Sequence, residues 1–150
     1  LPGPAEGGIV PILVGDKDLS TEPSLSIDGP GGGLAVNLDD QLRFMRGLLA
    51  GGALPPLEDF KVPEGRWGRF NRGIDYGRGL MVIRPGGLSP FMKSYPDLYG
   101  HSGITGAFLY YVPEYDAVIT GSFNTTAWGR SRHVIFLLEV LDILGRIEKG

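Results

Sequence analysis

The residue types that could do chemistry gather in one stretch, residues 99–106. His101 and Ser102 stand there between glycines, and the run 107–112 directly after them is aromatic and apolar, as a β-strand would be. An imidazole and a hydroxyl can orient a bound molecule, and glycines let a ligand or another chain approach the backbone closely. We therefore expect a functional strand edge here. A hydrogen-bonded, inert histidine on a sheet edge is the alternative.

Other chemistry is less well supported by the sequence. Ser102 is not interpreted as a nucleophile, because Ile104 occupies the second glycine position of a nucleophile elbow and a strand follows it instead of a helix. Two distant histidines with scattered carboxylates lack the spacing of a metal site, so we expect no metal and no cofactor. His133, among apolar residues of a helix, is interpreted as structural.

The strands that must position this stretch can be predicted from its surroundings. Residues 107–112 and 117–123 predict a β-hairpin, with turn residues between them. Upstream, residues 76–83 predict one strand that ends at Pro85, and residues 53–75 predict a long connection. Arginines spaced by three in that connection are interpreted as a solvated surface, with an anion site as the alternative.

Two helices are predicted to complete the fold. Asn37 is a suitable N-cap, apolar residues recur after it at helical spacing, and Gly51 supplies the stop. Residues 131–147 predict a second helix that is apolar most of the way round, so we expect a sheet on one side and another layer or a partner chain on the rest. Residues 1–33, rich in glycine and proline, predict an extended, loop-rich lead-in.

Composition limits the class of protein. The chain has 150 residues, enough for one domain, and its 42% hydrophobic content argues against disorder even though glycine and proline make up about a quarter of it. A net charge of −3 without a Lys/Arg block predicts no nucleic-acid binding. No apolar run reaches about 18 residues, so no transmembrane segment is expected. The absence of cysteine does not decide the compartment; a periplasmic or secreted location is slightly favoured over a cytoplasmic one.

The Gly-His-Ser-Gly stretch at 100–103 resembles the Lys/His-Thr/Ser-Gly strand of the serine β-lactamase and penicillin-binding-protein superfamily. The class C β-lactamase, D-aminopeptidase and family VIII esterase branch is the most similar part. Two further segments fit in the same order: residues 31–52 are similar to the family's glycine pair and helix, and Tyr-Gly-Arg-Gly-Leu at 76–80 to its Tyr-Gly-x-Gly strand. The resemblance covers roughly residues 30–145 and only the C-terminal part of that family's domain.

The resemblance implies a fold and a domain organisation. We expect an α+β fold in which the C-terminal helix packs on an antiparallel sheet, with a further helix from the family's mostly helical region. Residues 1–150 would then form a single partial domain, the C-terminal portion of a β-lactamase-like domain.

The resemblance also implies roles for individual residues. His101, Ser102 and Gly103 would line one wall of a cleft, where they orient the substrate. The backbone N–H of Ile104 would form half of an oxyanion hole, a type of donor worth about 2.7–4 kcal/mol to the transition state. A histidine where β-lactamases usually carry lysine favours an esterase or a D-peptidase.

Two further residues are candidates for binding substrate. Arg132 loosely matches a family position that can face substrate carboxylates, with a surface arginine as the alternative. Asn124, which follows the predicted hairpin, is the second candidate.

The catalytic centre of that superfamily needs two motifs, Ser-x-x-Lys and Tyr-x-Asn or Tyr-x-Ser. No serine of the chain has lysine three residues later, and no tyrosine has Asn or Ser two residues later. Because residue 1 is Leu and not Met, we expect these groups in an N-terminal part that is not in this sequence and acts as its partner.

The function implied is the C-terminal portion of a serine hydrolase. It would act by acyl transfer on a small ester, amide or D-peptide, and this chain alone would be inactive. A non-catalytic binding or interaction domain of the same fold is the alternative.

Overall fold

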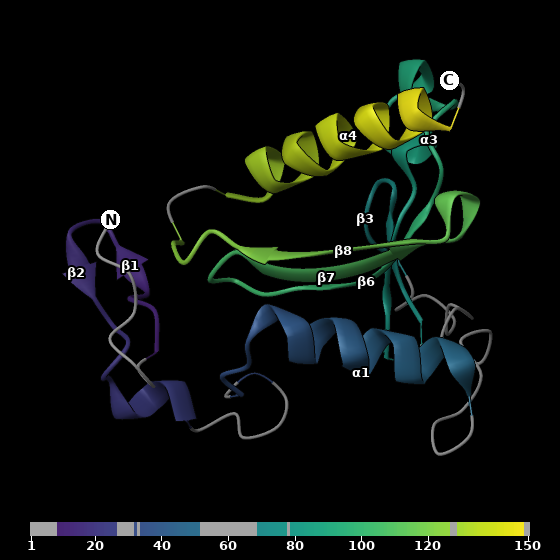
Figure 1. Ribbon diagram of the computed structural model, residues 1–150. Helices are drawn as coiled ribbons and strands as arrows, with labels where there is room; N and C mark the ends of the chain where they lie inside the picture. The colour runs from purple at the N-terminus through teal and green to yellow at the C-terminus, as the bar shows by residue number, and fades with distance from the viewer. Residues whose placement is uncertain are drawn as a thin grey trace.

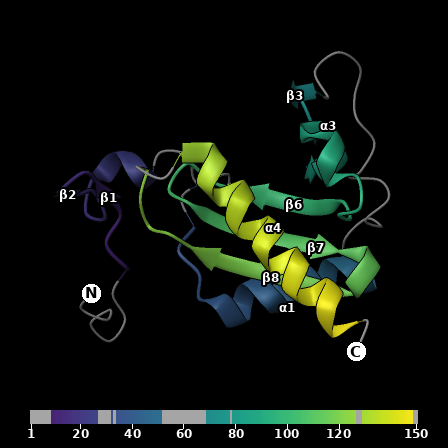
Figure 2. The same ribbon diagram turned by 90° about the horizontal axis from the view of Figure 1, so that it is seen from above.

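A computed structural model describes residues 9–26, 32, 34–51, 69–77, 79–126 and 129–148. Its elements in chain order are β1 (Leu13–Val14), β2 (Lys17–Asp18), η1 (Pro23–Ser26), α1 (Leu38–Ala50), β3 (Arg69–Asn71), β4 (Ile74–Tyr76), β5 (Met81–Ile83), α3 (Pro85–Leu88), η4 (Pro90–Met92), β6 (Leu98–Ser102), β7 (Ala107–Val112), η5 (Pro113–Tyr115), β8 (Ala117–Ser122) and α4 (Gly129–Ile147). The chain is therefore α+β, as predicted, and its layers are α4, the sheet and α1 (Figures 1 and 2).

The sheet is a six-stranded antiparallel meander with the order β3-β4-β5-β6-β7-β8. The longest ladder joins β7 to β8, from Ala107 opposite Ser122 to Val112 opposite Ala117. This is the hairpin that the aromatic and β-branched residues predicted, and the short helix η5 makes its turn. The predicted hairpin is confirmed.

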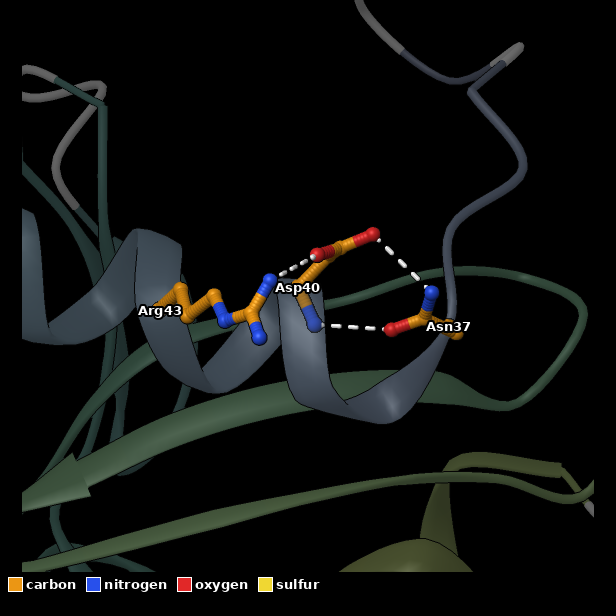
Figure 3. A network of polar contacts seen from close by, with 3 residues as sticks. All are labelled: Asn37, Asp40 and Arg43. Atoms are coloured by element: carbon orange, nitrogen blue, oxygen red, sulfur yellow. Dashed lines mark hydrogen bonds and ion pairs between the residues drawn. The ribbon is translucent and has the colours of Figure 1, made fainter.

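Helix α1 begins at the predicted cap. The Asp40 N–H donates to Asn37 Oδ1 over 2.8 Å, and Asn37 Nδ2 donates to Asp40 Oδ2 over 2.9 Å, so the cap and the first turn bind each other reciprocally (Figure 3). Arg43 completes this network by an ion pair with Asp40 at 3.4 Å. The predicted helix is confirmed from its cap to its glycine stop at Gly51.

The two faces of the sheet are covered by different helices. On the α4 face, which we define by Phe108 and Tyr110, the sheet packs against Leu137 and Leu141 of α4, each 1% exposed. On the α1 face, defined by His101, Leu109 and Thr120, the Thr120 hydroxyl donates to Gln41 of α1. Burying a leucine side chain contributes about 1.5–3 kcal/mol, so the core on the α4 face is a main source of stability.

Helix α4 begins at Gly129, slightly before the predicted start, and ends as predicted at Ile147. Its outward side carries Ile135, Ile143 and Ile147, which are 54–70% exposed. The sheet therefore covers one side of this helix, as predicted. These three isoleucines stay exposed, so the further layer or partner chain expected on the rest of the helix stays a prediction. Within the described residues, no helix is long and apolar enough to cross a membrane.

Two predictions upstream of the site are wrong. Residues 76–83 are not one strand, because Tyr76 ends β4, Met81 begins β5, and the Gly77 N–H donates to the Leu80 carbonyl across a turn. Gly79 makes this reversal possible with a φ of 142°, a backbone conformation that favours glycine. The connection predicted over 53–75 also ends earlier, because β3 and most of β4 belong to the sheet; its part at 53–68 lies outside the described residues.

The lead-in contains a small hairpin of its own. Strands β1 and β2 pair in an antiparallel manner, and the Leu13 N–H donates to the Asn124 carbonyl over 2.8 Å. The Thr126 N–H donates back to the Leu13 carbonyl. This hairpin therefore lies against the segment that links β8 to α4 (Figure 1). Residues 1–8, 27–31 and 33 of the predicted lead-in lie outside the described residues.

Candidate functional site

The candidate site is the end of β6. Strand β6 pairs with β7 along its length, so that His101 lies opposite Leu109 and Ser102 opposite Phe108. On its other side β6 pairs with β5 only as far as Gly100, which lies opposite Met81. His101 and Ser102 thus extend past the end of β5, and no described strand pairs with them on that side. We call this two-residue end of β6 the open edge.

The backbone of the open edge presents polar groups to the space beyond β5. The Gly103 N–H donates to the Ala107 carbonyl over 2.8 Å, which sets the alternation of the β6–β7 ladder. His101 and Gly103 therefore direct their backbone groups toward β7, and Ser102 directs its groups toward the open edge. The next N–H on that side is that of Ile104, for which no described residue provides a backbone acceptor.

A tight turn fixes Ile104. The Gly106 N–H donates to the Gly103 carbonyl over 3.1 Å, and Gly106 has a φ of 84°. A three-residue hairpin loop that ends in a left-handed glycine joins two strands in this way. The Ile104 side chain is 88% exposed, so packing does not explain its position. The turn holds the backbone at residue 104, and the side chain contributes little.

His101 and Ser102 point to opposite faces of the sheet, because neighbouring residues of a strand alternate. His101 is exposed on the α1 face, and its ring meets the Tyr76 ring edge-on at 5.6 Å between centroids. Ser102 is half-buried on the α4 face, where its Oγ accepts a hydrogen bond of 3.2 Å from the Tyr110 hydroxyl. The two side chains can contact a common ligand only across the open edge.

A small apolar cavity adjoins His101. Its volume is about 230 Å³, and α1, the β4–β5 turn, β6 and β7 line it. The lining residues are Phe44, Met45, Leu48, Gly79, Leu80, Gly100, His101 and Leu109. The lining is apolar except for His101, which supplies the one polar side chain among these residues.

Asn124 lies close to the turn that carries Ile104. The Thr125 N–H donates to the Thr105 carbonyl over 2.9 Å, which ties the segment after β8 to that turn. Asn124 itself has a φ of 51°, and its Oδ1 accepts from the Ser122 hydroxyl at 2.5 Å. The structure thus brings Asn124 near the 103–106 turn, and its carboxamide oxygen is already hydrogen-bonded to Ser122. Arg132 belongs to the first turns of α4, and its side chain lies outside the described residues.

Tyr110 is a member of the site that the sequence analysis missed. It is fully buried, and its hydroxyl lies 3.2 Å from both Ser102 Oγ and Met81 Sδ. A sequence signal for it did exist: once the loop 103–106 is recognised as a hairpin turn, the register places Tyr110 diagonal to Ser102 on the same face. Met81 had no such signal, because its place opposite Gly100 depends on pairing across a long connection.

His133 is half-buried and packs against aromatic residues on the α4 face. Its ring stands 5.2 Å from the Phe108 ring and 5.9 Å from the Tyr110 ring, and its Nε2 has no partner among the described residues. Burial lowers the pKa of His133, so the neutral imidazole is favoured. This environment fits the structural role expected of it. Among the described residues no group of three or more His, Cys, Asp or Glu side chains could hold a metal ion.

An antiparallel sheet with a C-terminal helix on one face, a helix on the other and a Gly-His-Ser-Gly strand edge is the arrangement expected of a serine-hydrolase-like fold. The comparison with protein families identifies the family: the family described as Beta-lactamase matches residues 2–141, and the chain belongs to this family. Neither the curated proteins nor the solved structures contain a match to the chain.

Proposed function

We propose that this chain is the C-terminal portion of a serine hydrolase that works by acyl transfer on a small ester, amide or D-peptide. The open edge carries the proposal. It carries the Ser102 backbone groups and, on opposite faces of the sheet, the Ser102 hydroxyl and the His101 ring; the Ile104 N–H follows in the adjoining turn. Membership of the Beta-lactamase family supports the proposed reaction class.

The proposed division of labour follows from what the chain contains. A serine hydroxyl must attack the substrate carbonyl, a base must take its proton, and the negative charge must move onto the carbonyl oxygen. The chain has no Ser-x-x-Lys and no Tyr-x-Asn or Tyr-x-Ser, so these groups come from an N-terminal part of the same protein. This chain supplies the Ile104 N–H for the oxyanion, and His101, Ser102 and Gly103 for the wall of the cleft.

The substrate-binding side of the proposal uses three residues. The His101 ring is exposed and free to contact the substrate, and the absence of lysine at this position favours an ester or a D-peptide over a β-lactam. Asn124 stands beside the Ile104 turn. Arg132, near the start of α4, would bind a substrate carboxylate.

A second candidate function is a non-catalytic binding domain that keeps the cleft wall alone. One observation favours it: neither catalytic motif occurs anywhere in the 150 residues. Both candidates use the open edge as the binding site. They differ in whether an upstream serine is present to attack the bound molecule.

Labelling with a fluorophosphonate probe tests the proposal, with the labelled residue identified by peptide mass spectrometry. The 150-residue chain alone should remain unlabelled, and the protein that includes the upstream sequence should be labelled at an upstream serine. Labelling at Ser102 of the isolated chain would overturn the assignment of the nucleophile. An upstream sequence with neither motif and no labelling would leave the binding domain as the function.

Ile104→Pro tests the oxyanion donor itself. Proline removes the N–H, and it suits the first central position of a turn, so the turn should persist. In the labelled protein we expect kcat/KM to fall by about 100- to 1000-fold, the usual effect of losing one such donor. Ile104→Ala keeps the N–H and should lose far less. Equal losses in the two variants would remove Ile104 from the oxyanion hole.

A further inference from the structure

Tyr110 occupies an unusual place for a polar side chain. It is 0% exposed, on a strand whose other side chains on this face, Phe108 and Val112, are apolar. Its partner across the ladder is Gly100, and the partner of Gly100 on the next strand is Met81. Because Gly100 has no side chain, the Tyr110 ring can extend over it until its hydroxyl reaches Met81 Sδ at 3.2 Å.

The same hydroxyl reaches the open edge. Tyr110 Oη lies 3.2 Å from Ser102 Oγ, its diagonal neighbour on the α4 face. The phenol has one proton and two neighbours that could accept it. A hydroxyl oxygen is a much better acceptor than a thioether sulfur, so the Tyr110 hydroxyl donates its proton to Ser102 Oγ. Burial raises the pKa of Tyr110 further above its ordinary value, which keeps the phenol protonated and able to donate.

This bond decides what Ser102 can do. Its oxygen accepts from Tyr110, and its own proton faces only Met81 Sδ, at 3.9 Å, among the described residues. A contact of that length to sulfur is weak, so the proton is available for a better acceptor. Ser102 is the last residue of β6 and lies at the open edge, where a ligand would provide such an acceptor.

We propose that Tyr110 is a positioning residue that fixes the Ser102 hydroxyl as a hydrogen-bond donor toward the open edge, so that this edge selects ligands with a carbonyl or carboxylate oxygen. The selection of substrate rests on the proposed function. The orientation of Ser102 by Tyr110 does not, because both residues and their contact belong to this chain.

The orientation can be tested on the 150-residue chain by proton NMR of the Tyr110 hydroxyl. A buried, hydrogen-bonded phenol proton should exchange slowly enough to give a resonance, and Tyr110→Phe assigns it. We expect this resonance to shift or disappear in Ser102→Ala and to stay unchanged in Tyr111→Phe. Tyr111 is the matched control, since its hydroxyl donates to Asp116 at 3.1 Å on an exposed part of the sheet. A Tyr110 resonance that ignores Ser102→Ala would overturn the proposal.

The consequence for the substrate can be tested in the protein that includes the upstream nucleophile, with a p-nitrophenyl ester. Tyr110→Phe should reduce kcat/KM by roughly 2- to 10-fold, the value of one ordinary hydrogen bond. In a Ser102→Ala background the same change should have no further effect, because Tyr110 acts through Ser102. The Tyr111→Phe variant should behave as the wild type.

The outcomes separate the two proposals. An equal loss for Tyr110→Phe with and without Ser102 would mean that Tyr110 has a structural role only, and thermal unfolding of each variant shows whether the fold itself has changed. A protein with the upstream part that hydrolyses no ester would overturn the proposed function and the choice of substrate. The NMR result on the isolated chain would still decide the orientation of Ser102.

Discussion

Gly100→Ala is the change that most directly tests how the open edge is built. A methyl group on Gly100 would overlap the Leu109 carbonyl oxygen and would lie 2.7 Å from Tyr110 Cα. These atoms belong to the backbone of β7, so no side-chain rotation relieves the contact, and β6 and β7 must move apart. Overpacking in a close-packed region usually costs about 1–3 kcal/mol, and a backbone clash belongs at the upper end of that range.

Gly103→Ala is the matched control, because Gly103 lies three residues further along the chain and also hydrogen-bonds to the strand that follows β6. A methyl group there would meet only Thr105 Oγ1 at 3.8 Å and the Ala107 carbonyl oxygen at 3.9 Å, which are ordinary contacts. For a chain of this length about 3 kcal/mol corresponds to a fall in Tm of roughly 6–12 °C. Thermal unfolding followed by circular dichroism should show this fall for Gly100→Ala and almost no change for Gly103→Ala. Similar Tm values for the two variants would refute the close approach of β6 and β7.

Two further predictions concern the core and the helix cap. Burial holds the pKa of His133 below its ordinary 6.5, so the unfolded chain takes up the proton first and stability is lost as the pH falls below about 6.5. When the pH is lowered from above to below that value, the free energy of unfolding should fall less for His133→Phe than for the wild type. Equal falls in urea unfolding would show that His133 does not cause this loss. Asn37→Ala removes the acceptor for the Asp40 N–H and should lower the free energy of unfolding by about 1 kcal/mol, and Asn37→Ser should recover most of it. No difference between these two variants would show that the cap is unimportant.

The elements that sequence reasoning predicted well are those determined by local chemistry. Helix α1 has a cap, an apolar stripe and a glycine stop within one segment, and the β7–β8 hairpin has two apolar strands around a proline turn. Strand β3, by contrast, has the sequence Arg-Phe-Asn, which has little preference for a strand. It belongs to the sheet because it pairs with β4, and such a tertiary contact leaves no local signal.

The sequence could nominate a candidate site but could not give its geometry. The His-Ser pair between glycines pointed to one strand, and its role stays a prediction, whereas family membership confirmed the superfamily. Whether His101 and Ser102 lie at an open edge depends on where β5 stops, and that residue is fixed by the turn between β4 and β5. Strand alternation alone predicted that the two side chains lie on opposite faces of the sheet. Which helix covers each face could not be predicted from the strand alone.

The length of β5 also explains how the fold tolerates an open edge. An exposed strand edge is a template for unwanted pairing with other chains, and proteins limit it by keeping such edges short. Here the Gly77–Leu80 turn ends the β4–β5 ladder at Met81, which leaves two residues of β6 without a partner strand on the β5 side before the Gly103 turn begins. An edge of this length is too short for another strand to pair with stably. The same turn that limits the risk of aggregation therefore leaves the open edge that we propose as the binding site.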